Sequence, residues 1–349
     1  MTDQLNRPAP PRAQETPVRP SRAGRGEARF ALFLLLPAAF VVFGVVVYPV
    51  VRTLVTSVLD VDGPLDDSTP FVGVSNYVEA LGDPGFWRAV WQTSYFSVTS
   101  IFFEVVFGVG IALLLNAPLR ARWLFRAIVI VPWALPTIVS GAMWRYIFSG
   151  QYGALNAVLT QLGLMDEYRS WLGSDPFLAL NMVMAADVWK NTSLVAFLLL
   201  AGLQNIPSDL YEAARIDGAG PIRSFFSITV PMLVPSIVIV LVLRTIDTVR
   251  IFDIVYIVTG GGPASGTQTV AFYTYVRAFS DQRLGYGSAL SYLVTAVVLV
   301  LSVVYLRTLR KRGHCCEVQD LHPRRRRVRG RGVPRPAGLA RHRQRVRAP

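Results

Sequence analysis

The stretch EAARIDGAGPIRSFFSITVP, residues 212–231, follows one apolar segment, 177–203, and leads into another, 225–243. Both segments approach or exceed the roughly 20 apolar residues that a helix needs to cross a bilayer. The stretch itself has four charged residues and a Gly-Ala-Gly-Pro turn. A polar segment in this position predicts a short loop between two membrane spans to which another protein can bind.

The composition agrees with a membrane protein. Of the 349 residues, 52% are hydrophobic and 16% are charged, a balance too apolar for an ordinary soluble domain. Four apolar segments have no charged residue and two have charges inside them: 30–51, 127–144, 225–243 and 288–306, and then 89–115 and 177–203. We expect an all-α integral membrane domain over 30–312, with six transmembrane helices. Pro132 and Pro136 predict a kink in the third span.

The distribution of Lys and Arg predicts the orientation. With six spans, both termini lie on one side with the loops 117–126 and 204–224. These segments, up to Arg312, hold 15 Lys and Arg in 66 residues, against 7 in 110 on the other side. Positive residues concentrate on the cytoplasmic side, so both termini should be cytoplasmic in a multi-pass plasma (inner) membrane protein.

The loop 204–224 is expected to form two short helices joined by a sharp turn. Ser208 is a suitable N-cap for the first helix. That helix should run through Asp217, because Gly218 can adopt the left-handed conformation that ends a helix. Pro221 is suited to the first position of the second helix. A helix of about ten residues is marginal alone, so we expect it to pack on its own bundle or on a partner.

These residues resemble the signature of the permeases of binding-protein-dependent ABC importers. The signature is Glu-Ala-Ala, three residues, Gly, nine residues, then Ile-x-Leu-Pro. This chain meets it with Glu212, Ala213, Ala214, Gly218, Ile228 and Pro231, with Val230 in place of the leucine. In that family the loop is the coupling helix, which docks in a cleft on the ATP-binding subunit. The resemblance implies this role for Glu212, Ala213, Ala214 and Gly218, with Asp217 as a neighbour. The alternative is an ordinary loop that only reverses the chain.

The resemblance extends over most of 30–312. The motifs GVSNY at 73–77, VPWALP at 131–136, MWRYIF at 143–148 and TGGGPASGT at 259–267 are similar to the carbohydrate-uptake branch of the family. More narrowly, they resemble the first of its two paired permeases, the maltose/glycerol-3-phosphate type. The cargo implied is a sugar, an oligosaccharide or a sugar-like polyol phosphate.

The resemblance also implies partners: a second permease subunit, two ATP-binding subunits, an extracytoplasmic solute-binding protein and membrane lipid. A phosphate-binding loop needs Gly-Lys-Ser/Thr, but the only lysines, Lys190 and Lys311, follow Trp189 and Arg310. We therefore expect ATP to be bound by the partner subunits and no cofactor in this chain. No nucleophile constellation or metal site is evident, so we expect no catalytic residue and no enzymatic activity of its own.

Charged residues inside the spans are candidates for the solute path. Ionisable groups in a bilayer are costly unless they face a cavity or a partner, so Glu104, Asp187 and Lys190 should point inward. Asp187 and Lys190 are three residues apart, close enough to pair on one helical face that Asn191 extends. These four residues either line a polar path for a hydroxyl-rich solute or form a structural ion pair that holds helices together.

Three further charges, Arg244, Asp247 and Arg250, recur at every third residue where the fifth span ends. We interpret them as an interfacial ion-pair ladder, with a gate or a binding-protein contact as the alternative. Glu104 and Asp187 also leave a rival class open, a secondary transporter driven by an ion gradient. Such a protein should show inverted repeats, and none is visible.

The two ends of the chain differ from its centre. Residues 1–29 are rich in Pro and Arg and are expected to be disordered. The net charge is +13, and residues 313–349 hold eleven Arg against Glu317 and Asp320. This tail is either a disordered basic segment beside the anionic inner leaflet or a frameshifted translation, which the abrupt change in composition favours. Because the charge is concentrated there, we expect no nucleic-acid partner.

Overall fold

The computed structural model describes residues 25–63, 69–118 and 120–313, and the described residues up to Ser302 form one compact unit. The described residues after Ser302 are the end of the last helix. The predictions for 1–24 and 314–349 lie outside these ranges. The first helix begins at Arg25, five residues before the predicted boundary of the membrane domain at residue 30.

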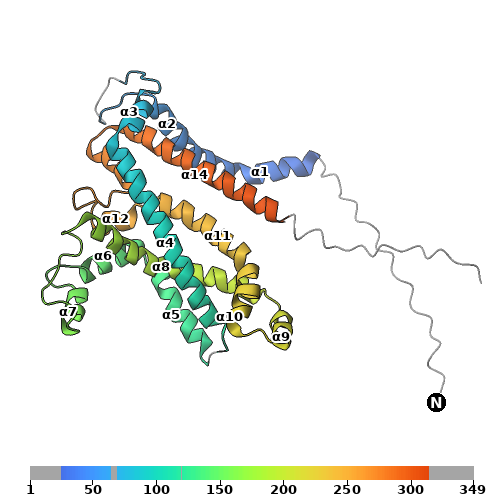
Figure 1. The fold of residues 1–349 in the computed structure, drawn as a ribbon. Coiled ribbons are helices and arrows are strands. Elements are labelled where there is room, and N and C mark those ends of the chain that lie inside the picture. The colour runs from blue at the N-terminus through green and yellow to red at the C-terminus, as the bar shows by residue number, and fades with distance from the viewer. Residues whose placement is uncertain (1–24, 64–68, 119, 314–349) are drawn as a thin grey trace, which may run out of the picture. The chain divides into compact units, whose positions relative to one another are not determined.

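Among the residues that the structure describes, five helical segments are long and apolar enough to cross a membrane. The first is continuous through a π-helical turn, because the backbone stays helical on both sides of it. The described elements that build these segments are α1 (Arg25–Val41), η1 (Val42–Val47), α2 (Tyr48–Ser57), α4 (Pro84–Asn116), α8 (Pro176–Gln204), α10 (Pro221–Ser224), η2 (Phe225–Thr229), α11 (Val230–Val249) and α14 (Leu284–Gly313) (Figure 1).

The third predicted span is broken into α5 (Arg122–Ala134) and α6 (Thr137–Ile147), which meet at an angle of 91°. Proline has no N–H to donate and disfavours helical backbone in the preceding residue. Leu135, before Pro136, accordingly has an extended ψ of 135°. The predicted kink is confirmed at Pro136, whereas Pro132 stays inside α5. If the two halves form one span, the number of spans is six.

Short helices connect the spans, and the motif GVSNY contributes to the first of them. They are α3 (Ser75–Gly82), α7 (Ala154–Gln161), α9 (Ser208–Ile216), α12 (Asp253–Val258), α13 (Val270–Tyr275) and η3 (Val276–Ser280). Within the described ranges there is no β-strand, only two isolated bridges.

The central helices α4 and α8 approach closely because one of them has a glycine at the contact. A Cβ on Gly108 would lie only 2.6 Å from Cγ1 of Val195. Helix α11 packs on this pair through an apolar cluster that includes Ala112, Leu199 and Leu233, all fully buried. The three helices therefore form one tightly packed core.

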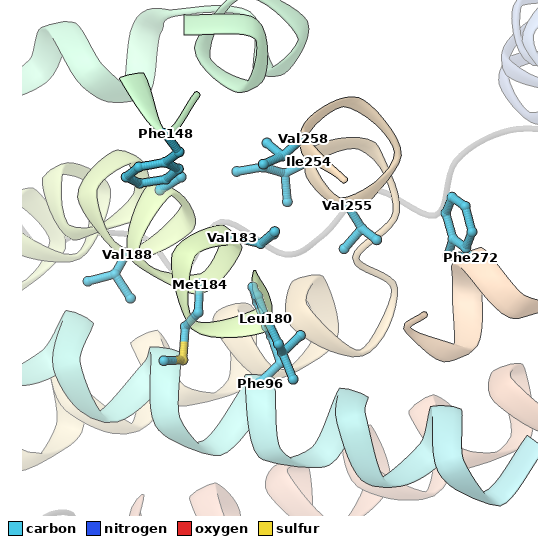
Figure 2. Packing of buried hydrophobic residues seen from close by; sticks show 11 residues of the cluster. Phe96, Phe148, Leu180, Val183, Met184, Val188, Ile254, Val255, Val258 and Phe272 are labelled. Atoms are coloured by element: carbon cyan, nitrogen blue, oxygen red, sulfur yellow. The ribbon is translucent and has the colours of Figure 1, made fainter. Parts of the chain in front are cut away.

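A second apolar cluster lies at the other end of the same helices. Phe96 of α4 and Val183 of α8 pack with Ile254 and Val255 of α12 (Figure 2). This cluster fixes α12 and the segment before it against the long helices. In sequence, Glu104 falls between the buried residues that α4 contributes to the two clusters, and Asp187 on α8 lies between Ala186 and Val188 of the second cluster.

Candidate functional site

One buried arginine joins three helices. From α11, Arg244 donates through Nε to Oε2 of Glu104 on α4 at 2.7 Å, and through Nη2 to Oε1 at 2.7 Å. Nη2 also donates to Oδ2 of Asp187 on α8 at 2.9 Å. Relative exposure is 0% for Glu104, 6% for Asp187 and 4% for Arg244. The sequence prediction that both carboxylates point inward is confirmed.

The buried charges are well supplied with hydrogen bonds. The remaining oxygen of Asp187, Oδ1, accepts from Nδ2 of Asn191 at 2.8 Å. Each of the four carboxylate oxygens of Glu104 and Asp187 thus has a donor. A planar guanidinium suits this arrangement because its donors form a rigid fork that fits a carboxylate with two parallel bonds.

The predicted pair of Asp187 and Lys190 is wrong. Asp187 pairs with Arg244, whereas Nζ of Lys190 donates to the hydroxyl of Thr137 at 2.6 Å. The reason is that α11 brings a permanently charged fork into the buried space beside Asp187. Lys190, which is only partly buried, reaches across to the start of α6 instead.

The predicted interfacial ladder is also wrong at its first member. Arg244 is buried, and its contact with Asp247 is the longest of its ion pairs, 3.7 Å between Nη1 and Oδ2. Sequence reasoning therefore missed the residue at the centre of the cluster. The signal was present, because two carboxylates inside apolar segments require a cation and the fifth span ends with Arg244.

A cavity of about 330 Å³ adjoins the cluster, between α6, α8, α11 and the start of α12. Asp187, Lys190 and Asn191 all line this cavity, which is the arrangement that a common solute path requires. Glu104 does not line it, and is closed off on α4 by its bonds to Arg244. Further polar groups on the wall come from Thr137, Asp247, Thr248, Arg250 and Asp253. The wall has hydrogen-bond donors and acceptors and charges of both signs, which suits a solute with many hydroxyl groups.

The loop residues of the importer signature lie on α9 and the turn after it. Glu212, Ala213 and Asp217 are exposed, Ala214 is half-buried, and no residue of α9 is buried. Gly218 has a φ of +76°, the left-handed conformation expected from the sequence. The predicted N-cap is wrong by one residue, because Ser208 is already helical and Pro207 precedes it without a side-chain cap.

Two large apolar side chains beside the signature were missed. Ile216, the last residue of α9, is 87% exposed, and Ile222 on α10 is 75% exposed. The signature loop therefore presents both charge and apolar surface.

Comparison with protein-family models matches residues 104–311 to "Binding-protein-dependent transport system inner membrane component". Two curated relatives are sugar permeases by name. The sulfoquinovosyl glycerol transport system permease protein SmoG of Agrobacterium fabrum is 40% identical over 82% of this chain and 92% of its own length. The trehalose/maltose transport system permease protein MalF of Thermococcus litoralis is 41% identical over 82% of this chain and 95% of its own length.

A solved structure shares the fold. A chain of a bacterial ABC transporter involved in the import of the acidic polysaccharide alginate superposes with a TM-score of 0.69. The match covers 82% of this chain and 96% of that chain, at 21% sequence identity. The helical membrane architecture is therefore that of an ABC permease.

Proposed function

Since the chain belongs to the family of inner membrane components of binding-protein-dependent transport systems, we propose that it forms part of the solute channel of an ATP-driven sugar importer. The cargo is a sugar or oligosaccharide. Two relatives support this cargo. They are permeases named for sulfoquinovosyl glycerol and for trehalose and maltose, and they are 40% and 41% identical to this chain over most of its length and of their own.

The assembly that we propose has four kinds of component. This chain pairs with a second permease, two ATP-binding subunits clamp the loops of the two permeases, and an extracytoplasmic binding protein delivers the solute. The relatives named above are described as permease proteins of transport systems, which supports such an assembly. ATP is hydrolysed in the partner subunits, and the α9 side of this chain faces the cytoplasm together with both termini.

Coupling to ATP hydrolysis is assigned to Glu212, Ala213, Ala214, Asp217 and Gly218. Support comes from the exposure of Glu212, Ala213, Asp217 and Gly218, from α9 having no buried residue, and from the exposed Ile216 among them. A helix this short gains stability by packing on a partner. The solute path is assigned to the 330 Å³ cavity with Asp187, Lys190 and Asn191, while Glu104 supports its wall through Arg244.

The first experiment identifies the partners. A tagged copy of the chain is purified from its native membrane in mild detergent, and the proteins that accompany it are identified by mass spectrometry. We expect an ATPase with a phosphate-binding loop and a second permease, with the ATPase lost in a Glu212→Ala/Gly218→Asp double variant. Recovery of the chain alone, still active in ion-driven uptake, would refute the importer and indicate a secondary transporter.

A matched pair of glycine variants then tests the coupling turn. Gly218→Asp forces a side chain into the left-handed conformation, whereas Gly220→Ala changes a neighbouring glycine with an ordinary φ of −70°. We expect Gly218→Asp to abolish uptake of radiolabelled trehalose or maltose while membrane insertion remains, and Gly220→Ala to behave like the unmodified chain. Normal uptake in Gly218→Asp would contradict the coupling role.

A further inference from the structure

Helix α9 is attached to the bundle at a single side-chain hydrogen bond. The hydroxyl oxygens of Tyr211 on α9 and Thr229 on η2 lie 2.9 Å apart, and either can be the donor. Within the described part of the chain, no other side-chain hydrogen bond joins α9 to another element. α9 also has no buried residue, so this bond is a specific contact that ties it to η2.

Thr229 is well placed to receive a force from α9. Its side chain is buried, with 4% exposure, and it is the last residue of η2, which continues without a break into α11. Four residues further, Leu233 is fully buried against α4 and α8. Arg244 follows fifteen residues after Thr229, or about 22 Å along the helix axis, where it holds Glu104 and Asp187 beside the polar cavity.

The covalent connection from α9 to α10 does not by itself fix the angle between them. Between α9 and α10 the chain passes through Gly218 and Gly220, and glycine permits a wide range of backbone angles. A cavity of about 790 Å³ is lined by both α9 and η2, with Arg215 of α9 and Phe226 of η2 in its wall beside Leu113 of α4. A displacement of α9 would therefore be absorbed at the glycine turn unless a contact spans that turn, as the Tyr211–Thr229 bond does.

We propose that the Tyr211–Thr229 hydrogen bond is the contact through which a movement of α9 displaces α11 and, through Arg244, the wall of the polar cavity. Tyr211 and Thr229 are positioning residues in this scheme. The proposal rests on the proposed function, in which ATP-binding subunits move α9. It adds the point on this chain at which the movement enters the bundle.

The test separates transmission from assembly. Tyr211→Phe and Thr229→Val each remove one hydroxyl with little change of shape, and the double variant completes a mutant cycle. Tyr292→Phe is the matched control, because its hydroxyl also bonds another element, the carbonyl of Val50 at 2.5 Å, away from α9. Each variant is purified with its partners, with Cys315 and Cys316 replaced by serine and a reporter cysteine at Asp253 in the cavity wall.

Two quantities are measured on each complex, the rate of ATP hydrolysis and the rate at which the reporter reacts with 2-(trimethylammonium)ethyl methanethiosulfonate. The reaction is followed on this chain by mass spectrometry, without nucleotide and with ATP and vanadate. We expect ATP hydrolysis to continue in every variant. The nucleotide-dependent change in reactivity should fall roughly 2- to 30-fold in Tyr211→Phe and Thr229→Val, and no further in the double variant. Tyr292→Phe should keep the full change.

Three results would overturn the proposal. The first is a nucleotide-dependent change in reactivity that stays at its full size in both single variants. The second is a double variant in which the losses of the two single variants add up. The third is loss of the ATPase subunit from the Tyr211→Phe complex, which would assign Tyr211 to partner binding. Failure of the proposed function looks different. In that case the unmodified complex itself shows neither ATP hydrolysis nor a nucleotide-dependent change, and the proposal falls with it.

Discussion

Arg244 and Glu104 are 140 residues apart in sequence, yet two hydrogen bonds of 2.7 Å join them inside the bundle. Removing one partner of a buried ion pair leaves the other charge uncompensated, which costs about 3–5 kcal/mol. We expect Arg244→Met to lower the thermal stability of the purified protein by this order. Arg244→Lys should not restore it, because an ammonium cannot reproduce the two-pronged contact.

The control for this prediction changes both partners. A Glu104→Gln/Arg244→Gln double variant removes the two opposite charges together, so it should be more stable than Arg244→Gln alone. Thermal unfolding in detergent, followed by tryptophan fluorescence, measures each variant. Equal stability of Arg244→Met and the unmodified protein would show that the cluster does not hold the helices together.

Close packing of α4 on α8 gives a second prediction. An alanine at position 108 would place its Cβ 2.6 Å from Cγ1 of Val195, and overpacking of this kind costs about 1–3 kcal/mol. Gly108→Ala should therefore destabilise the protein, and Val195→Ala should relieve the clash in the double variant. Gly110→Ala is the matched control on the same helix, because nothing lies within 4 Å of its added Cβ. A loss of stability in Gly110→Ala equal to that in Gly108→Ala would contradict the packing explanation.

These two relationships mark the limit of sequence reasoning. The spans, the break at Pro136 and the left-handed Gly218 depend on local signals, namely apolar length, a missing N–H and a missing Cβ, and were predicted. The partner of Asp187 was not, because Arg244 is 57 residues away and the choice between it and Lys190 depends on how three helices pack. The position of Glu104 depends on the same packing, because Glu104 is buried against Arg244 and does not line the cavity.

Outside the spans, Asp83 predicts a pH dependence. Partial burial by itself raises the pKa of Asp83, but hydrogen bonds from the Tyr273 hydroxyl, the Gly85 amide and the Tyr286 hydroxyl outweigh it, so the pKa lies below its ordinary value. A carboxyl with a lowered folded-state pKa contributes stability above its unfolded-state pKa, and this is lost as the pH falls through the folded-state pKa. Acid should therefore weaken the contact between the start of α4 and α13.

The measurement compares melting temperatures from about pH 6 down to about pH 3. Asp83→Asn should be less stable than the unmodified protein at the upper end and lose less stability on acidification. Tyr286→Phe, which removes one of the donors, should change the slope in the same direction by a smaller amount. Parallel curves for Asp83→Asn and the unmodified protein would exclude this role for Asp83.

Substitution of Lys190 tests solute binding in the cavity separately from the stability that the Arg244 cluster provides. Its ammonium reaches the cavity and bonds Thr137, and it forms no part of the Arg244 cluster. A hydrogen bond to a charged group is worth about 1.5–3 kcal/mol, so Lys190→Met should raise the KM for sugar uptake about tenfold or more if the ammonium binds solute. Thermal stability should change little, in contrast to Arg244→Met. Thr137→Val is the control, because it removes the partner of Lys190 and keeps the cation, and should leave the KM within about twofold. A fall in stability without a change in KM for Lys190→Met would assign Lys190 to the scaffold and move the solute path elsewhere.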